Sequence, residues 1–314
     1  MTKLTHLIGI IKDKASQSKA ALLSKRTTLF LLRATSHDSS TPPTRKHLAT
    51  LLSSGDGSRA TASAAVEVLM DRLQGTNNAA VALKCLIAVH HIIHHGSFIL
   101  QDQLSVYPSA GGRNYLNLSN FRHNADPTSW ELSSWVRWFA KHIEQLLCTS
   151  RILGFFLGTR PTEKTGCRFD SLVALVEGIC KRPEPNNVYG NNGLVEEIVK
   201  LAREDWGVVE VEVRVRVSEF KERLGGFKFG EVVELVCCLK RLEQCQEMMD
   251  GARELGLWDF VGEVKDKAGI QVYRQEGKLR KESRKLRFSE SDRFSAPVLN
   301  SRDFLHFPSG RFLL

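Results

Sequence analysis

Long hydrophobic runs are missing from this chain of 314 residues. No stretch of about 18 uncharged apolar residues occurs, which is the length that a membrane-spanning helix requires. The short apolar run at the start leads directly into Lys12, Asp13 and Lys14, and no small-residue cleavage site of a signal peptide follows it. The two ends also lack the motifs for myristoylation and prenylation. Any contact with a membrane is therefore expected to be peripheral.

Motifs of catalysis and of structural metal binding are also missing. The chain has no Gly-rich phosphate loop, no Gly-x-Ser-x-Gly elbow and no Cys-x-x-Cys pair. Acidic pairs such as Glu196 and Glu197 are typical of solvated helix faces. We therefore expect a protein that is not an enzyme and binds no cofactor. Its seven cysteines form an odd number without a secretion signal, which indicates reduced thiols in the cytoplasm.

Acidic residues are scarce near both ends. Residues 1–50 hold nine Lys and Arg against two Asp and Glu, and residues 276–314 hold nine against five. The middle is nearly neutral although the net charge of the whole chain is +9. This distribution suggests a localised anionic partner, either membrane phosphoinositides or nucleic acid. No aromatic residue lies between Arg33 and Lys46 to stack on bases, and this disfavours nucleic acid.

What the sequence does contain is helical periodicity. Leu4, Leu7, Ile8, Ile11 and Ala15 recur at three- and four-residue steps and form one apolar stripe. Further helices are predicted over 18–35, 44–54, 58–74, 78–95, 130–156, 169–181, 191–205, 229–255 and 257–274. Successive helices with short loops predict an all-α fold, an α-solenoid or superhelix of about eight to ten helices.

Two segments fit this pattern less well. Residues 208–217 alternate strictly between Val and other residues, which locally favours a β-strand. An isolated strand would have no sheet to join, so we predict a helix there. From about residue 276 the apolar period is lost, and we therefore divide the chain into a helical domain, 1–275, and a basic, mostly disordered tail, 276–314.

A basic turn is the main candidate for function. A helix ends near Arg33, a Pro-rich loop follows, and a new helix starts at Arg45, Lys46 and His47. Free backbone N–H groups at that start add to the positive potential. A multiply phosphorylated head group needs several cations in one small volume, and these four side chains can supply them. The alternative is an ordinary charged helix start.

Secondary basic contacts with the same ligand are expected from Lys25 and Arg26, which precede the turn along the chain.

Four histidines, at positions 90, 91, 94 and 95, are the main candidates for metal binding. Pairs spaced four apart share a helix face and suit zinc. The metalloprotease motif, however, needs Glu after the first His, whereas Ile92 follows His91. The two pairs also lie on adjacent faces of a helix that is apolar enough to be buried. We therefore expect no metal, one packed histidine and several at an exposed helix end.

Four segments together resemble the ANTH domain, the N-terminal domain of clathrin assembly proteins, and its plant branch most closely. They are RATSH at 33–37 with PTRKH at 43–47, VALKCLIAVH at 81–90, YLNLSNFR at 115–122 and SWELSSWVR at 129–137. The resemblance implies an ANTH/ENTH-like superhelix and a structural role for His90. It also implies a peripheral adaptor that binds phosphatidylinositol bisphosphate, supports clathrin-coat assembly and sorts SNARE cargo. The implied locations are coated pits of the plasma membrane, coated vesicles and the Golgi apparatus.

The lipid-binding motif of this family is Lys, nine residues, Lys, one residue, Lys or Arg, then His or Tyr. By resemblance Arg33 takes the first position, and Lys46 and His47 take the last two. The second Lys position falls on Thr44, and the spacer before it is one residue longer. Arg45 occupies the intervening position. The departures leave the head-group preference open.

Recruiting motifs are missing from the tail. Family members carry Asp-Leu-Leu, Asn-Pro-Phe or Asp-Pro-Phe sequences in a long C-terminal region, and none occurs after residue 276. Clathrin binding is therefore expected to be weak or indirect. The alternative function is a helical scaffold for protein interactions without specific lipid binding.

Overall fold

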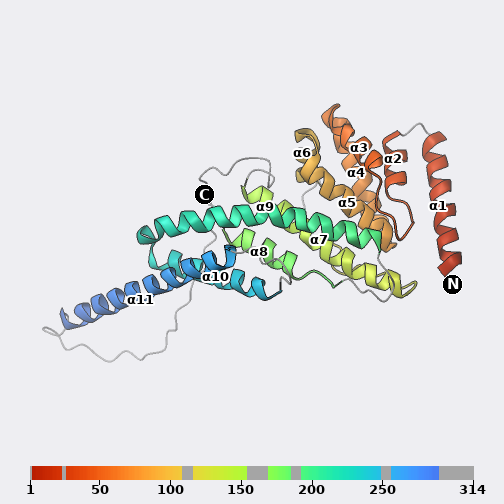
Figure 1. Cartoon of the computed structure of the whole chain (residues 1–314). Helices are drawn as coiled ribbons and strands as arrows, with labels where there is room; N and C mark the ends of the chain where they lie inside the picture. Colours follow the sequence, from red (N-terminus) through yellow and green to blue (C-terminus); the bar gives the residue numbers. More distant parts are fainter. Residues whose placement is uncertain are drawn as a thin grey trace, which may run out of the picture.

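The computed structural model is an elongated stack of helices, with α1 at one end and α11 at the other (Figure 1). It describes residues 2–22, 26–107, 116–153, 169–184, 192–248 and 256–289. The regular elements within these ranges are helices, and no strand occurs among them. The predicted all-α fold is confirmed, with eleven α-helices in the described ranges instead of eight to ten.

The chain order of the helices is simple. The first half contains α1 (Thr2–Leu22), α2 (Arg26–Ala34), α3 (Arg45–Leu52), α4 (Arg59–Gly75), α5 (Ala79–His95) and α6 (Phe98–Val106). The second half contains α7 (Pro127–Leu153), α8 (Phe169–Cys180), α9 (Gly193–Arg223), α10 (Phe229–Met248) and α11 (Leu257–Ser289). Short 3-10 turns, η1 (Ser53–Gly55) and η3 (Leu224–Gly226), directly follow α3 and α9.

Two hydrophobic cores lie along the stack. The first core joins α2 to α7 and the beginning of α9, and its buried residues include Leu31, Leu69, Leu83, Trp135, Phe139, Leu194 and Leu201. The second core joins the end of α7, α8, the rest of α9, α10 and α11, and includes Leu146, Phe169, Val209, Val213, Leu239 and Val264. Helices α7 and α9 contribute to both cores, so they tie the two halves together.

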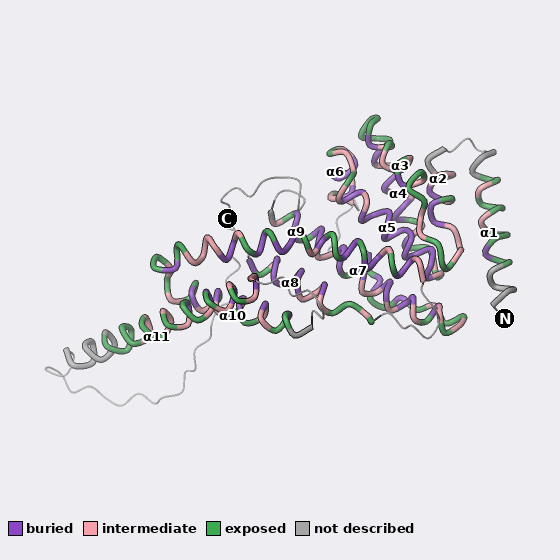
Figure 2. Tube along the Cα trace, viewed as in Figure 1, coloured by how far each residue is buried: buried purple, intermediate pink, exposed green. Residues whose placement is uncertain are grey.

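The most deeply buried element is α5 (Figure 2). Its side chains are apolar almost all round, which is typical of a helix enclosed by others. The helix begins where the Asn78 side chain accepts a hydrogen bond from the Val81 N–H at 3.0 Å. It ends at Gly96, where a Cβ atom would lie 2.5 Å from the Ile92 carbonyl oxygen. The predicted central helix over 78–95 is confirmed.

The valine-rich segment is helical, as predicted, because α9 runs through it without a break. Val209, Val213 and Val217 recur every four residues and are almost completely buried in the second core. The burial of this stripe outweighs the local preference of valine for strands.

Three boundaries differ from the prediction. Helix α1 continues to Leu22, so no new helix begins at Ser18. The short helix α6 was not predicted, because only Leu100, Gln101 and Leu104 of its nine residues are buried. Helix α11 continues to Ser289, through the first part of the predicted tail. Good helix formers and an ion pair of 2.7 Å between Arg280 and Glu276 favour this extension.

Some predicted segments lie outside the described residues. They are 154–156 and 249–255 at the ends of two predicted helices, and 290–314 in the predicted tail. Among the helices that the structure describes, none is both long enough and apolar enough to cross a membrane.

Candidate functional site

The basic turn between α2 and α3 places its cations as the sequence predicted. Arg33 is exposed in the last turn of α2, and Arg45 and Lys46 are exposed in the first turn of α3. His47 follows them and is half-buried. All four predicted residues therefore flank one short loop.

The helix start is set by Thr44, the residue where the family motif has a lysine. Its hydroxyl accepts a hydrogen bond from the His47 N–H at 3.4 Å and lies 2.9 Å from His47 Nδ1. Thr44 has the extended backbone of an N-cap residue, with φ −70° and ψ 145°. The uncharged residue thus fixes the start of α3 and, through it, the place of Arg45 and Lys46.

His47 reports the positive potential of the turn. Burial lowers the pKa of His47, and the charges of Arg33 and Lys46 lower it further. Like charges disfavour the protonated imidazole only when they are close to it. Arg33 and Lys46 come from two different helices, so the loop brings their charges to one place.

Beneath the turn, a half-buried arginine and a buried lysine hold the loop from the inside. Arg72 of α4 donates a hydrogen bond of 2.6 Å to the carbonyl oxygen of Thr35, and its Nε lies 2.5 Å from the Thr35 hydroxyl. Lys84 of α5 donates to the Ser36 hydroxyl at 3.0 Å. Burial lowers the pKa of Lys84 to about 8, although Asp38 and Asp13 act in the opposite direction.

Helix α1 is attached to the same loop. Asp13 accepts a hydrogen bond of 2.7 Å from the His37 N–H and lies 2.6 Å from His37 Nδ1. The approach is close at Gly9, where a Cβ atom would lie 2.8 Å from the Cβ atom of His37. The loop is therefore held in place by contacts with α1, α4 and α5. These contacts also fix the helix ends that carry the exposed cations.

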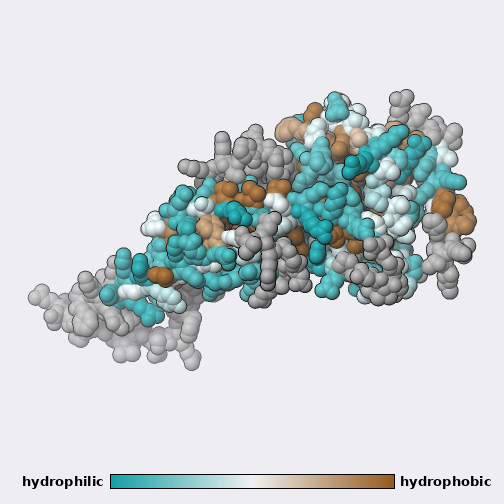
Figure 3. Space-filling view, viewed as in Figure 1, coloured by the Kyte–Doolittle hydropathy of each residue, from teal (hydrophilic) through white to brown (hydrophobic). Residues whose placement is uncertain are grey.

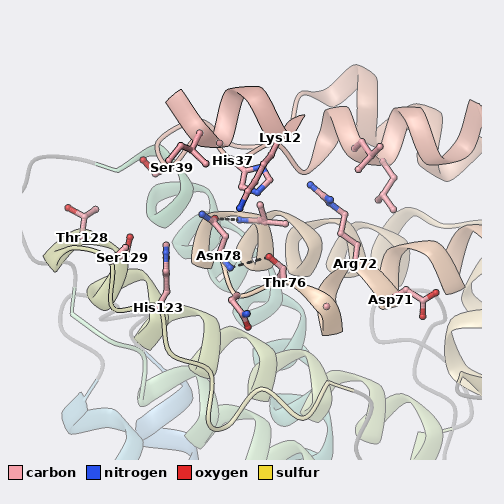
Figure 4. Close-up of a pocket in the computed structure, with 18 of the residues that line it drawn as sticks. Lys12, His37, Ser39, Asp71, Arg72, Thr76, Asn78, His123, Thr128 and Ser129 are labelled. Atoms are coloured by element: carbon pink, nitrogen blue, oxygen red, sulfur yellow. Dashed lines mark hydrogen bonds between the residues drawn. The ribbon is translucent and has the colours of Figure 1, made fainter. Parts of the chain in front are cut away.

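A groove of about 920 Å³ lies on the α1 side of this loop. Figure 4 shows Lys12, Arg72 and His123 entering it from separate elements. Asp71 and Asp126 line it as well, so its charges are mixed. The groove does not include Arg45, Lys46 or His47, and it is distinct from the basic turn.

Comparison with known proteins decides the family. A family model of the ANTH domain matches residues 30–182. An Arabidopsis thaliana protein named "Putative clathrin assembly protein At4g40080" is 45% identical, over 99% of this chain and 95% of its own. This chain is a member of the ANTH-domain clathrin assembly protein family. A second Arabidopsis thaliana relative, "Putative clathrin assembly protein At5g10410", is 32% identical over 79% of each chain.

The family match covers the chain unevenly. The ANTH model begins inside α2, just before the basic turn, and ends after α8. Helices α9, α10 and α11 lie beyond it, yet the first relative is similar over nearly the whole chain. The second core and its helices therefore belong to what this chain shares with that relative.

Two of the segments that resemble the ANTH domain, 115–122 and 129–137, pack against each other. Leu116, Leu118 and Phe121 of the segment at 115–122 are buried, whereas Tyr115 lies outside the described residues. Arg137 of α7 donates a hydrogen bond of 2.9 Å to the carbonyl oxygen of Phe121. This contact fastens the loop to the helix that follows it.

The predicted secondary contacts are only partly visible. Lys25 lies outside the described residues, and Arg26 begins α2 with a side chain that is not described.

The histidines meet a partner that the sequence analysis missed. His90 is buried as predicted, and its Nε2 lies 2.9 Å and 3.0 Å from the two carboxylate oxygens of Asp205 in α9. A signal for Asp205 did exist in the sequence. It falls on the apolar stripe of α9 between Leu201 and Val209, where a charged residue is unusual.

Proposed function

We propose that this chain is a peripheral membrane adaptor that binds phosphatidylinositol bisphosphate through Arg33, Arg45, Lys46 and His47. The observation that carries the proposal is the exposure of Arg33, Arg45 and Lys46 on the two sides of one loop, which Arg72 and Lys84 hold from beneath. A phosphorylated head group favours several cationic donors held in one small volume. Because the loop is already ordered, little further ordering opposes binding.

The exposed face of α1 supports a membrane partner. Leu7 and Ile11 are 56% and 59% exposed, and Ile8 and Ile10 are exposed beside them. Figure 3 shows this apolar surface at the end of the molecule that carries α1. Lys12 and Lys14 lie exposed on the same helix. Apolar side chains next to cations suit the interface of an anionic membrane.

The coat is the second partner in this proposal. The relatives named above are named for clathrin assembly, and we infer that this chain supports the assembly of clathrin coats and the sorting of SNARE cargo. Coated pits at the plasma membrane, coated vesicles and the Golgi apparatus are the proposed places of action. The missing recruiting motifs make the link to clathrin weak or indirect.

Co-sedimentation with liposomes tests the lipid site. Each cation near an anionic membrane contributes about 1 kcal/mol. Replacing Arg33, Arg45 and Lys46 together with Ala should therefore weaken binding to vesicles with phosphatidylinositol bisphosphate by about 3 kcal/mol, or more than a hundredfold. The melting temperature should hardly change, because the three side chains are exposed.

A matched control separates the site from net charge. The triple variant Lys141→Ala, Lys200→Ala and Lys240→Ala removes three exposed cations from α7, α9 and α10. We expect it to retain most of the binding. Equal binding by the wild type and the basic-turn variant would reject the lipid site and favour the scaffold alternative.

A further inference from the structure

A cluster of imidazoles surrounds one buried carboxylate in the middle of the molecule. Helix α5 contributes His90 and His94, α7 contributes His142, and α9 contributes Asp205. The side chains of His142 and Asp205 are completely buried, and those of His90 and His94 are 3% and 17% exposed. Three ring nitrogens thus meet a carboxylate that has no contact with solvent.

The cluster lies where the two cores meet. On α9, Leu201 belongs to the first core and Val209 to the second, and Asp205 lies between them. On α7, His142 lies between Phe139 of the first core and Leu146 of the second. A polar group at this position holds the two halves of the stack together only if its charge is compensated.

The charge of Asp205 is compensated by imidazoles alone among the described residues. Within the described residues its ion-pair partners are the three histidines, with no Lys or Arg among them. A carboxylate in an apolar interior is costly unless a cation or several good hydrogen bonds stabilise it.

The direction of His94 is informative. Its Nε2 lies 2.8 Å from Oδ1 of Asp205, on the opposite carboxylate oxygen from His142. Together with His90 it places two imidazole nitrogens beside one carboxylate, which is a donor set that can bind a metal ion. His142 takes the other side of the carboxylate, where its Nε2 lies 2.5 Å from Oδ2.

We propose that His90, His94 and Asp205 form a zinc site, with His142 as a positioning residue for the Asp205 carboxylate. The ligand atoms of these three residues lie within 4.8 Å of one another. Zinc in proteins is tetrahedral with bonds of about 2.0–2.2 Å, which places neighbouring ligand atoms about 3.3 Å apart. The observed separations of 2.8–3.0 Å need to open only slightly.

The chemistry of the donors fits zinc better than calcium or magnesium. Two imidazole nitrogens and one carboxylate are ligands that zinc accepts, whereas calcium and magnesium require oxygen. The three residues supply three ligands, and a water molecule would supply the fourth. The hydrogen bond from His142 orients the carboxylate, as outer partners of metal ligands do. Such an ion would join α5 to α9 across the boundary of the two cores.

Cobalt titration of the full chain tests this site, because cobalt in a tetrahedral zinc site gives visible absorption bands. We expect the wild type to bind one equivalent of cobalt and to release it to zinc. His94→Gln should weaken cobalt binding at least tenfold, since it removes one ligand while keeping a similar volume. Asp205→Asn should do the same where it folds, and His94→Gln carries the test where it does not, because His94 reaches the surface.

The second histidine pair supplies the control. The rings of His91 and His95 lie 5.6 Å apart on the same helix, but they do not contact Asp205. The double variant His91→Gln and His95→Gln should therefore bind cobalt like the wild type. Failure of the wild type to bind cobalt or zinc would overturn the proposal. Loss of binding in the double variant but not in His94→Gln would overturn it as well, and would assign the metal to the surface pair.

Discussion

Helix α5 contacts two polar clusters that differ in what they do. At Lys84 it meets the braced loop under the basic turn, and at His90 and His94 it meets Asp205 in the interior. Lys84 and His90 are both almost completely buried in an otherwise apolar helix. The first cluster touches a loop whose other side is exposed, whereas the second has core residues on both sides.

The contrast shows how position decides the role of a buried polar group. Lys84 lies one layer below the surface, and its hydrogen bond to Ser36 positions a backbone that carries exposed cations. Asp205 is completely buried where the two cores meet, and its described ion pairs are all with imidazoles. Loss of the first cluster should therefore affect ligand binding, and loss of the second should affect folding.

The largest expected effect comes from removing the centre of the interior cluster. Asp205→Ala leaves three imidazoles without their shared acceptor, and such losses cost about 3–5 kcal/mol of the free energy of unfolding. Urea unfolding measures this cost. Lipid binding by the fraction that remains folded should be unchanged, because the basic turn keeps its own braces.

Glu204→Ala is the matched control for this change. Glu204 precedes Asp205 on α9 but is exposed, and its ion pair with Lys200 is long at 4.0 Å. Its loss should cost less than about 0.5 kcal/mol. If Asp205→Ala lowered the free energy of unfolding no more than Glu204→Ala, the interior cluster would not be needed for folding, and the contrast with the first cluster would be wrong.

The pH dependence of stability tests the burial of Lys84. The pKa of Lys84 is about 8 in the folded protein, whereas the ordinary value of 10.5 applies to the unfolded chain. Between these values the unfolded chain holds more protons, so the Lys84 contribution to stability rises with pH. Each pH unit well inside this window is worth about 1.4 kcal/mol, and the rise from pH 8 to pH 10 should be about 2 kcal/mol.

The variant Lys84→Met serves as the reference for this measurement, because it keeps the volume and removes the titrating group. Unfolding free energies of both proteins should be compared by urea titration at several pH values from 7.5 to 10. The wild type should gain stability relative to the variant as pH rises. Parallel curves would contradict the inward, desolvated position of Lys84.

The smallest effect should come from His47 at the exposed edge of the first cluster. Burial, and then the charges of Arg33 and Lys46, lower the pKa of His47. Acidification through that pKa adds one cation to the turn. One cation near the membrane contributes about 1 kcal/mol, or about a fivefold gain in affinity. Liposome co-sedimentation at pH 7.5 and pH 5.5 measures this gain, and the comparison with His47→Gln isolates it from titration of the lipid itself. An equal gain in both proteins would exclude His47 as its source.

Much of the fold could be predicted from the sequence because a buried helix face produces a periodic pattern of apolar residues along the chain. Apolar residues at steps of three and four predicted α5, and the alternation of 208–217 was correctly set aside because no sheet was available to it. Short motifs predicted the family and the placement of Arg33, Arg45 and Lys46 around one turn. The short helix α6 has a weaker apolar pattern, since few of its residues are buried.

The sequence by itself determined the helical class, the family and the cations of the basic turn, because each depends on residues that are neighbours along the chain. Tertiary structure alone decided which buried groups meet. Lys84 and Ser36 are 48 residues apart, and His90 and Asp205 are 115 residues apart. No local pattern encodes such pairs, because helix packing brings them together and desolvation then makes each polar group depend on the partner that it finds.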